Sequence, residues 1–222
     1  MLLDSSQKPQ FSYKKIVEII EEHYGFKAKI APLDSYMDQN FHVTTNFDKE
    51  FILKIARPSE SWNSLDAQNK ALEFLYKRNW FYHSPTPIQS KSGFDIIQIK
   101  GEDGHDYHFR LLRFLQGKLL VDVEPHSPKL LVDLGKFAAS LDKTLKDFSH
   151  HGAHRQIPWD IKNVMQIQKL AGYITDVERR RILEYFLTQF ELAILPKLIQ
   201  TKSSIIHNLS LIHISEPTRL RR

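Results

Sequence analysis

Alternating apolar and polar residues mark short strands in the first half of the chain. Residues 26–31, 41–45 and 51–56 follow this pattern, and turn-forming residues separate them. Two further segments, 94–99 and 107–112, flank a Gly-Glu-Asp-Gly sequence that is typical of a tight turn. The pattern predicts five strands, the first of which would end at Pro32.

Apolar residues recur at helical spacing before the first strand and again after the third. A first helix is predicted from Ser12 to Tyr24, with Gly25 as the residue that ends it. A second helix is expected to begin at Ser64, whose hydroxyl can cap its first turn. Strands and helices therefore share the first half of the chain.

The second half of the chain has a helical pattern throughout. Ser127-Pro128 is typical of a helix start, and helices are also predicted over 160–171 and 176–195. Asp160 is interpreted as a helix cap, and Pro196 would end or kink the last helix. The predicted fold class is α+β, with a five-stranded antiparallel lobe followed by a helical lobe.

Lys54 lies in the middle of an otherwise apolar strand, Phe51 to Ala56. Desolvating an ammonium costs several kcal/mol unless an anion or a carboxylate meets it. Such a lysine is either an edge-strand residue whose head reaches water or a residue that holds an anion. The order strand, strand, lysine strand, helix, strand, strand favours the anion, because the small lobe of protein-kinase-like folds has its phosphate-binding lysine on the third strand.

Five segments make the chain resemble the aminoglycoside phosphotransferase and choline kinase family, and within it the hydroxylysine-kinase-like branch. They are residues 35–41, 51–56, 65–69, 110–117 and 158–160. The resemblance implies a protein-kinase-like fold. Its parts would be an N-terminal helix (1–25), a nucleotide-binding lobe (26–113), a hinge and linker (114–126) and a partial helical lobe (127–208).

The resemblance also implies roles for residues around Lys54, which would contact the α- and β-phosphates of ATP. The loop 35–40 has no glycine, so Ser35, Gln39 and Asn40 would cover the phosphates through their side chains. An ordinary turn at residues 38–40 is the alternative.

On the following helix, Gln68 stands where the family usually places the carboxylate that pairs with the lysine, and Asp66 and Glu73 lie nearby. Glutamine can orient an ammonium through its carbonyl but brings no charge. Phe114 and Leu115 would belong to the hinge, whose backbone pairs with the adenine edge.

His207 and Asn208 would begin the catalytic loop, in which the family continues with a catalytic aspartate and with Mg²⁺ ligands. The chain instead continues with residues 209–222, whose first eleven residues resemble a translated sequencing adapter. We therefore expect a truncation at about Asn208 and a non-native tail at 209–222. A natural basic tail is the alternative.

Composition narrows the function classes. The chain has no cysteine, which excludes a disulfide framework and a Cys-based metal site. Its formal charge of +5 includes +2 from three arginines and one glutamate in the tail, and no basic block indicates a nucleic-acid partner. The histidines at 150, 151 and 154 are interpreted as a solvated loop rather than a zinc site, and no metal ligand is assigned. Without a signal peptide or a membrane-spanning run, a cytoplasmic protein with no membrane partner is expected.

Two functions remain open at this point. The first is the N-terminal portion of an ATP- and Mg²⁺-dependent kinase that acts on a hydroxyl of an amino-alcohol, amino acid or aminoglycoside-like acceptor and is inactive as this chain. The second is a non-catalytic nucleotide-binding or regulatory domain, in some arrangements fused to a class III aminotransferase.

Overall fold

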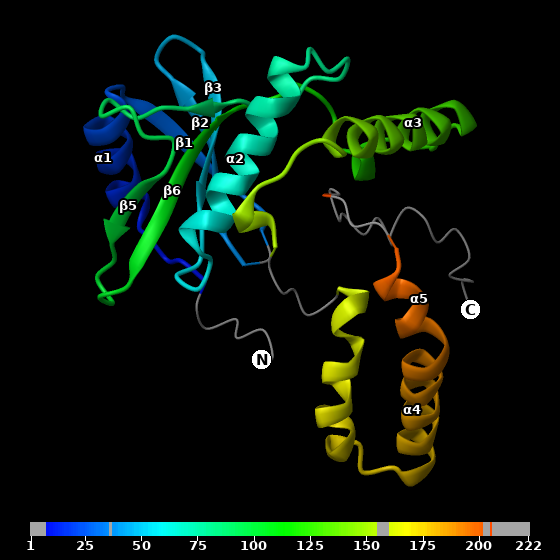
Figure 1. Ribbon diagram of the computed structural model, residues 1–222. Coiled ribbons are helices and arrows are strands. Elements are labelled where there is room, and N and C mark those ends of the chain that lie inside the picture. The colour runs from blue at the N-terminus through cyan, green and yellow to red at the C-terminus, as the bar shows by residue number, and fades with distance from the viewer. Residues whose placement is uncertain (1–7, 36, 155–159, 202–204, 206–222) are drawn as a thin grey trace.

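The first half of the molecule is built on one antiparallel sheet, seen on the left of Figure 1. The computed structural model describes residues 8–35, 37–154, 160–201 and 205. The strands are β1 Ala28–Leu33, β2 Gln39–Thr45, β3 Glu50–Ile55, β4 Pro87–Ile88, β5 Ile97–Lys100 and β6 Asp106–Arg113. They run in the order β1-β2-β3-β6-β4, and β5 also pairs with β6.

The α+β class is confirmed, and the strand count is corrected from five to six. The missed strand, β4, has two residues, and it is a strand because Pro87 and Ile88 pair with Leu112 and Leu111 of β6. The first strand also continues through Pro32, where we expected it to end. A proline is tolerated there because β1 is an edge strand. One side of an edge strand has no neighbouring strand, so a missing N–H on that side costs no hydrogen bond of the sheet.

One face of the sheet packs against the N-terminal helix α1 (Tyr13–Tyr24). Ser12 caps this helix by accepting a hydrogen bond from the backbone N–H of Lys15 (3.3 Å), and Gly25 ends it with a φ of 81°. Ile16, Ile19 and Ile20 are buried against the apolar strand residues of this face. The sheet and α1 thus form the main core, away from the polar face that carries Lys54.

The opposite face is partly covered by α2 (Trp62–Lys77), as Figure 1 shows. This helix begins earlier than predicted, because Ser61 caps it by accepting from the backbone N–H of Ser64 (3.2 Å). Ser64 is buried in the first turn, where its hydroxyl donates to Glu60 (2.5 Å). The start is therefore set one turn upstream of the serine that the pattern indicated.

The second half is helical, with α3 (Pro128–Leu145) starting at its Ser127 cap as predicted. α3 packs on α2 through a cluster around Leu75, Leu141 and Leu145. Short 3₁₀ turns lie at Leu120–Asp122 (η2) and at His151–Ala153 (η3), and η3 lies against α2.

The segment after Asp160 is helical as predicted, but it is a 3₁₀ helix, η4 (Ile161–Tyr173). Its apolar residues are spaced by three at Ile161, Val164, Ile167 and Leu170, which matches the three residues per turn of a 3₁₀ helix. Asp160 caps it by accepting from the backbone N–H of Lys162 (2.9 Å). The predicted cap is confirmed, and the structure adds the helix type.

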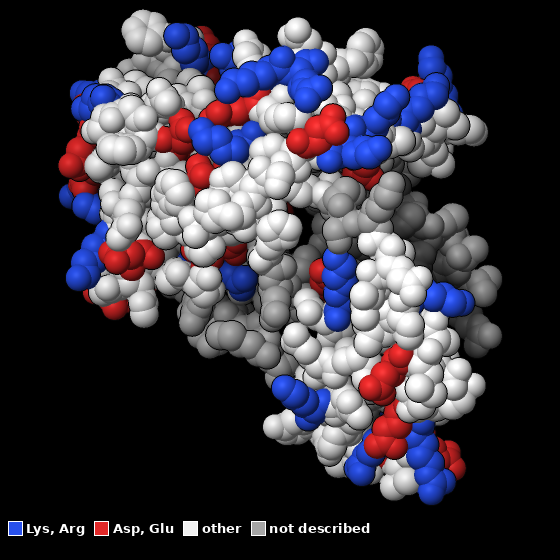
Figure 2. All heavy atoms as spheres, viewed as in Figure 1, with Lys and Arg blue, Asp and Glu red and all other residues white. Residues whose placement is uncertain are grey.

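The last predicted helix is divided into α4 (Val177–Gln189), a π-helical turn η5 (Phe190–Ile194) and α5 (Leu195–Ile199). Pro196 stands at the start of α5 and has no N–H for the preceding turn, so the widened turn before it is expected. α4 and η4 lie side by side in Figure 1, apart from the sheet. In the space-filling view of Figure 2, charged side chains of both signs are scattered over the sheet lobe.

In the described part of the chain, no helix is both long enough and apolar enough to cross a membrane.

Candidate nucleotide-binding site

Three polar side chains form a row across the centre of the sheet. Asn40 of β2 lies opposite Lys54 of β3, and Lys54 lies opposite Arg110 of β6. Residues directly opposite each other in neighbouring strands point to the same face. The row therefore lies on the face that α2 covers, opposite the core formed with α1.

Lys54 is placed on a central strand, which contradicts the edge-strand interpretation. Its Nζ lies 3.8 Å from Oδ2 of Asp38, and the two side chains are 27% and 29% exposed. Burial lowers the pKa of Lys54 below its ordinary value, Asp38 raises it in part, and the Arg110 guanidinium lowers it again. A half-buried ammonium beside a guanidinium is suited to an anionic ligand.

Arg110 connects this row to α2. Its guanidinium donates to Oε1 of Gln68 (2.9 Å), to Oδ1 of Asn69 (3.0 Å) and to the backbone oxygen of Leu65 (3.3 Å). Arg110 is 3% exposed and Asn69 is fully buried. Arg110 therefore holds α2 against the sheet, a role that sequence reasoning missed although Arg110 and Gln68 both lay in segments that carried the family resemblance.

The expected α2 partner of Lys54 is corrected by these contacts. The amide oxygen of Gln68 accepts from Arg110, Asp66 lies 3.1 Å from Nε2 of His150, and Glu73 pairs with Lys70 (3.0 Å). The ion-pair partner that the structure gives Lys54 is Asp38, which lies in the loop before β2 rather than on the helix.

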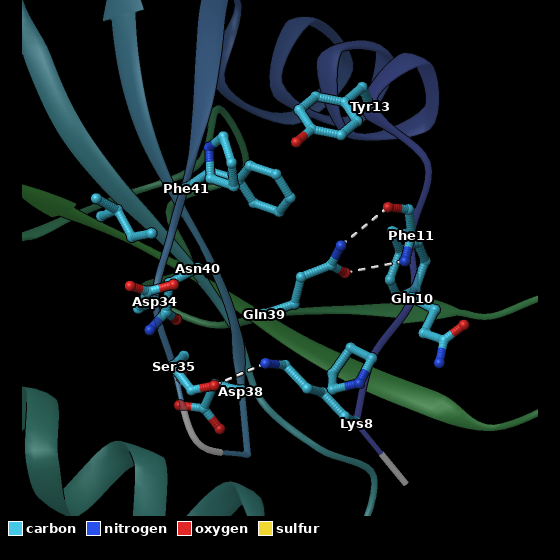
Figure 3. A pocket seen from close by; sticks show the side chains of 13 residues that line it. Lys8, Gln10, Phe11, Tyr13, Asp34, Ser35, Asp38, Gln39, Asn40 and Phe41 are labelled. Carbon is cyan, nitrogen blue, oxygen red and sulfur yellow. Dashed lines mark hydrogen bonds between the residues drawn. The ribbon is translucent and has the colours of Figure 1, made fainter. Parts of the chain in front are cut away.

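The loop residues expected to cover the phosphates divide between the two faces. The amide oxygen of Asn40 is buried and has no hydrogen-bond partner among the described groups, next to Lys54 in register. Gln39 lies opposite Ile55, so its side chain points to the other face, where it bonds to the backbone of Phe11 (Figure 3). The backbone oxygen of Ser35 accepts from Nζ of Lys8 (2.6 Å). The expectation that Gln39 donates to a phosphate is therefore corrected.

The next row along the same face is less polar. His42 lies opposite Ile52, and Ile52 lies opposite Leu112. The ring of Phe114 lies 4.4 Å from the His42 ring, and the Phe114 N–H donates to the backbone oxygen of Glu50 (3.2 Å). The start of the predicted hinge therefore lies beside this row, and Leu115 follows it as an exposed residue.

His42 is a further residue that sequence reasoning missed. Its Nε2 lies 2.9 Å from Oε1 of Glu50, and the Gln116 side chain donates to the same carboxylate. The signal was available, because His42 is two residues from Asn40 in the same strand, and strand residues that are two positions apart point to the same face. The sequence did not show whether this face is the one that carries Lys54, because that depends on the register of β2 against β3.

Of the histidine segment, His150 contacts α2 and corrects the expectation of a solvated loop, whereas His151 and His154 are exposed as expected. His150 Nε2 lies 3.1 Å from Asp66 of α2, and its Nδ1 accepts from the backbone N–H of Gly152 (3.1 Å). Gly152 approaches α2 so closely that a Cβ there would overlap the backbone oxygen of Asn63. Among the described residues, no group of three or more possible ligands is placed to hold a metal ion. His207, Asn208 and the tail 209–222 lie outside the described residues.

Comparisons with known proteins agree with this architecture. Residues 29–208 match the phosphotransferase enzyme family. The chain is 31% identical to the hydroxylysine kinase of Mus musculus over 218 residues, covering 91% of this chain and 58% of that protein. It is 30% identical to the hydroxylysine kinase of Bos taurus over 215 residues, covering 90% of this chain and 57% of that protein.

Two solved structures share the fold at low identity. An amicoumacin kinase in complex with AMP-PNP, Ca²⁺ and Ami superposes with a TM-score of 0.67 at 16% identity, covering 87% of this chain and 55% of that one. A microcompartment-associated aminopropanol kinase superposes with a TM-score of 0.54 at 16% identity, covering 67% and 46%. Both likenesses confirm the kinase-like fold. With its family match and its sequence relatives, this chain belongs to the phosphotransferase enzyme family.

Proposed function

We propose that this chain is the nucleotide-binding portion of an ATP-dependent kinase that phosphorylates a hydroxyl group of a small amine-bearing acceptor and works in the cytoplasm. The observation that carries the proposal is Lys54, a half-buried ammonium on a central strand, beside Arg110 and opposite Asn40. The functional division we propose is a nucleotide-binding lobe at 26–113, a hinge and linker at 114–126 and a helical lobe at 127–208.

The charges of the row support a phosphate ligand. Lys54 and Arg110 bring two positive charges to adjacent strands, and Asp38 offsets one of them at 3.8 Å from Lys54. ATP supplies the phosphoryl group and Mg²⁺ neutralises its developing charge. Lys54 holds the α- and β-phosphates in exchange for Asp38, and the Asn40 amide lies beside it. The Mg²⁺ ligands are expected in the catalytic loop after His207 and Asn208.

The less polar row supports the base. Ile52 and Leu112 present apolar surface on the same face as Lys54, and Phe114 lies at its border. Apolar side chains around a few polar groups are the usual lining of a nucleotide-base pocket. The backbone of Phe114 and Leu115 pairs with the adenine edge in this arrangement. The AMP-PNP of the amicoumacin kinase complex is consistent with this use of the fold.

The names of the relatives support an acceptor class. By name, hydroxylysine and aminopropanol each carry an amine and a hydroxyl, and each is the substrate of a protein similar to this one. We assign an amino-alcohol, an amino acid or an aminoglycoside-like compound as the acceptor. The chain spans about 58% of the mouse relative's length, and residues that contact the acceptor are expected in the remainder.

A second candidate is a non-catalytic nucleotide-binding or regulatory domain, in some arrangements fused to an aminotransferase. It is favoured if residues 209–222 are native, because after His207-Asn208 they contain no aspartate and a single carboxylate, Glu216. Kinase chemistry needs a base and metal ligands at that place. Sequencing the gene distinguishes the two candidates. An aspartate codon directly after that of Asn208, in place of Leu209, would favour the kinase.

Lys54→Met tests the proposal, with Lys49→Met on the exposed turn after β2 as the matched control. In the protein extended to the full length of its relatives, we expect Lys54→Met to lower ATP turnover on the order of a hundredfold or more. Unfolding temperature is expected to stay level or rise, because the lowered pKa of Lys54 means that its charge costs stability in the folded apo state. Turnover of Lys54→Met within about threefold of wild type would sink the nucleotide-site assignment.

A further inference from the structure

The side chain of Gln39 is bonded at both ends to one residue of the N-terminal segment. Its Oε1 accepts from the backbone N–H of Phe11 (2.9 Å), and its Nε2 donates to the backbone oxygen of Phe11 (3.0 Å). Figure 3 shows the side-chain amide of Gln39 paired with the backbone of Phe11 through two hydrogen bonds, as one strand residue pairs with another. The contact joins positions 28 residues apart in sequence.

Phe11 is itself fixed to the sheet. Its ring makes edge-on contacts with Tyr107 (4.9 Å between ring centroids) and with Phe109 (5.0 Å), which lie on β6. Ser12, the next residue, caps α1. The segment from Lys8 to Phe11, which we call the strap, is thus held at its C-terminal end by the core and by a helix start.

The strap also meets the loop before β2 at a second place. Nζ of Lys8 donates to the backbone oxygen of Ser35 (2.6 Å), as Figure 3 shows. A cavity of about 760 Å³ lies between strap and loop, and Lys8, Gln10, Phe11, Ser35, Asp38 and Gln39 are among its lining residues. The hydrogen bonds of Gln39 and Lys8 connect the strap to β2 and to the loop before it across this cavity.

Both neighbours of Gln39 meet Lys54, one from the loop before β2 and one from β2 itself. Asp38 forms the ion pair with Lys54, and Asn40 lies opposite Lys54 in the sheet register. Side chains alternate along a strand, so fixing Gln39 on one face presents Asn40 on the other. The contacts between Gln39 and the strap therefore lie on the opposite face of the sheet from Lys54.

We propose that Gln39 is a positioning residue, which sets Asp38 and Asn40 against Lys54 by clamping the loop to the strap at Phe11. This inference rests on the proposed function where it concerns nucleotide binding. Without the clamp, the loop would have to be ordered when the nucleotide binds, and the ordering cost would lower the affinity. No contact between Gln39 and the nucleotide is needed.

The test compares Gln39→Leu, which keeps the size of the side chain but removes both hydrogen bonds, with Gln10→Leu. Gln10 is exposed, lines the same cavity and lies in the strap itself. Gln39→Glu is the second variant, because it can still accept from the Phe11 N–H but cannot donate to its oxygen. Each variant is made in the protein extended to the full length of its relatives, and its fold is checked by circular dichroism.

Three measurements are read together: amide exchange of the strap, the rate at which an amine-reactive ester acylates Lys54, and the affinity for ATP with Mg²⁺ by calorimetry. For Gln39→Leu we expect faster exchange at Phe11, Lys54 acylation about two- to fivefold faster as Asp38 moves away, and a dissociation constant about three- to tenfold higher. Gln39→Glu is expected to lie between Gln39→Leu and wild type, and Gln10→Leu to match wild type.

The outcomes separate this inference from the proposed function. Faster exchange with unchanged Lys54 acylation and unchanged affinity would make the clamp purely structural and overturn the positioning role. If wild type binds no ATP, the proposed function fails, and the Lys54 acylation rate alone then decides whether Gln39 positions the loop. Equal effects of Gln10→Leu and Gln39→Leu would also overturn the assignment.

Discussion

At the scale of single residues, neighbouring positions of β3 and β6 send a charged and an apolar side chain to opposite faces of the sheet. Lys54 and Arg110 lie on the face toward α2, whereas Leu53 and Phe109, one residue away from each, are fully buried in the core with α1. The charged groups stay solvated in part or find acceptors, because an unmet buried charge costs several kcal/mol. Burial lowers the pKa of Lys54, and the nearby positive charge of Arg110 lowers it further.

His108 gives a prediction at this scale. It lies on β6 two residues before Arg110, its Nδ1 is buried without a hydrogen-bond partner among the described groups, and burial lowers its pKa while Asp106 raises it in part. The folded state therefore prefers neutral His108, and its stabilising effect is present above the unfolded pKa of about 6.5 and is lost as pH falls through the folded value.

We expect urea midpoints of the wild type to fall between pH 8 and pH 5, and His108→Gln to show a smaller fall. His105→Gln, in the exposed turn before β6, is the control and should follow wild type. Parallel pH profiles for wild type and His108→Gln would contradict the assignment.

At the scale of elements, α2 is docked by a buried arginine. Arg110 donates to three acceptors on the helix, and the α2 carboxylates Asp66 and Glu73 make their contacts elsewhere. Hydrogen bonds from a charged donor contribute more than neutral ones, and a buried acceptor left without a donor is costly. The place of α2 therefore depends on Arg110 whether or not a nucleotide is bound.

Arg110→Met tests this docking. The stem still packs, but Gln68, Asn69 and Leu65 lose their donor, so the free energy of unfolding is expected to drop by about 1–3 kcal/mol. Arg113→Met, three residues on in the same strand and exposed, should change it by less than about 0.5 kcal/mol. Urea unfolding of both variants checks the difference, and an equal loss in both would show that α2 is held by other contacts.

At the scale of the whole molecule, the helical half exposes much apolar surface. Exposed residues there include Tyr173 of η4 and Ile182, Tyr185 and Phe186 of α4, with Leu192 in the turn that follows. In Figure 2 the lower part of the molecule shows uncharged surface between charged side chains, and charges of both signs gather at its lower end. Exposed apolar patches of this kind favour association.

The chain of 222 residues is therefore expected to show no phosphotransferase activity on any hydroxyl acceptor and to associate at micromolar concentration. Phosphoryl transfer needs a positioned base and metal ligands, and the stretch after Asn208 has one carboxylate. A coupled ATP assay with light scattering checks both points. Turnover that depends on Mg²⁺, by the purified chain, would contradict the first.

The local features of this protein were readable from its sequence. Ser12 and Gly25 bound the first helix, Ser127-Pro128 starts α3, and Asp160 caps η4, because caps and turns depend on residues a few positions apart. The lysine strand and the α+β class followed from alternation and helical spacing. The three-residue spacing of η4 was present in the sequence too, and it predicted a helix there.

The tertiary structure decided how these parts meet. Alternation puts Gln39 and Asn40 on opposite faces, but only the register of β2 against β3 decides that Asn40 joins Lys54 and that Gln39 turns to Phe11. In the same way, the packing of α2 gives Gln68 to Arg110 and leaves Lys54 to Asp38. Contacts between residues distant in sequence depend on register and packing, which local patterns do not contain.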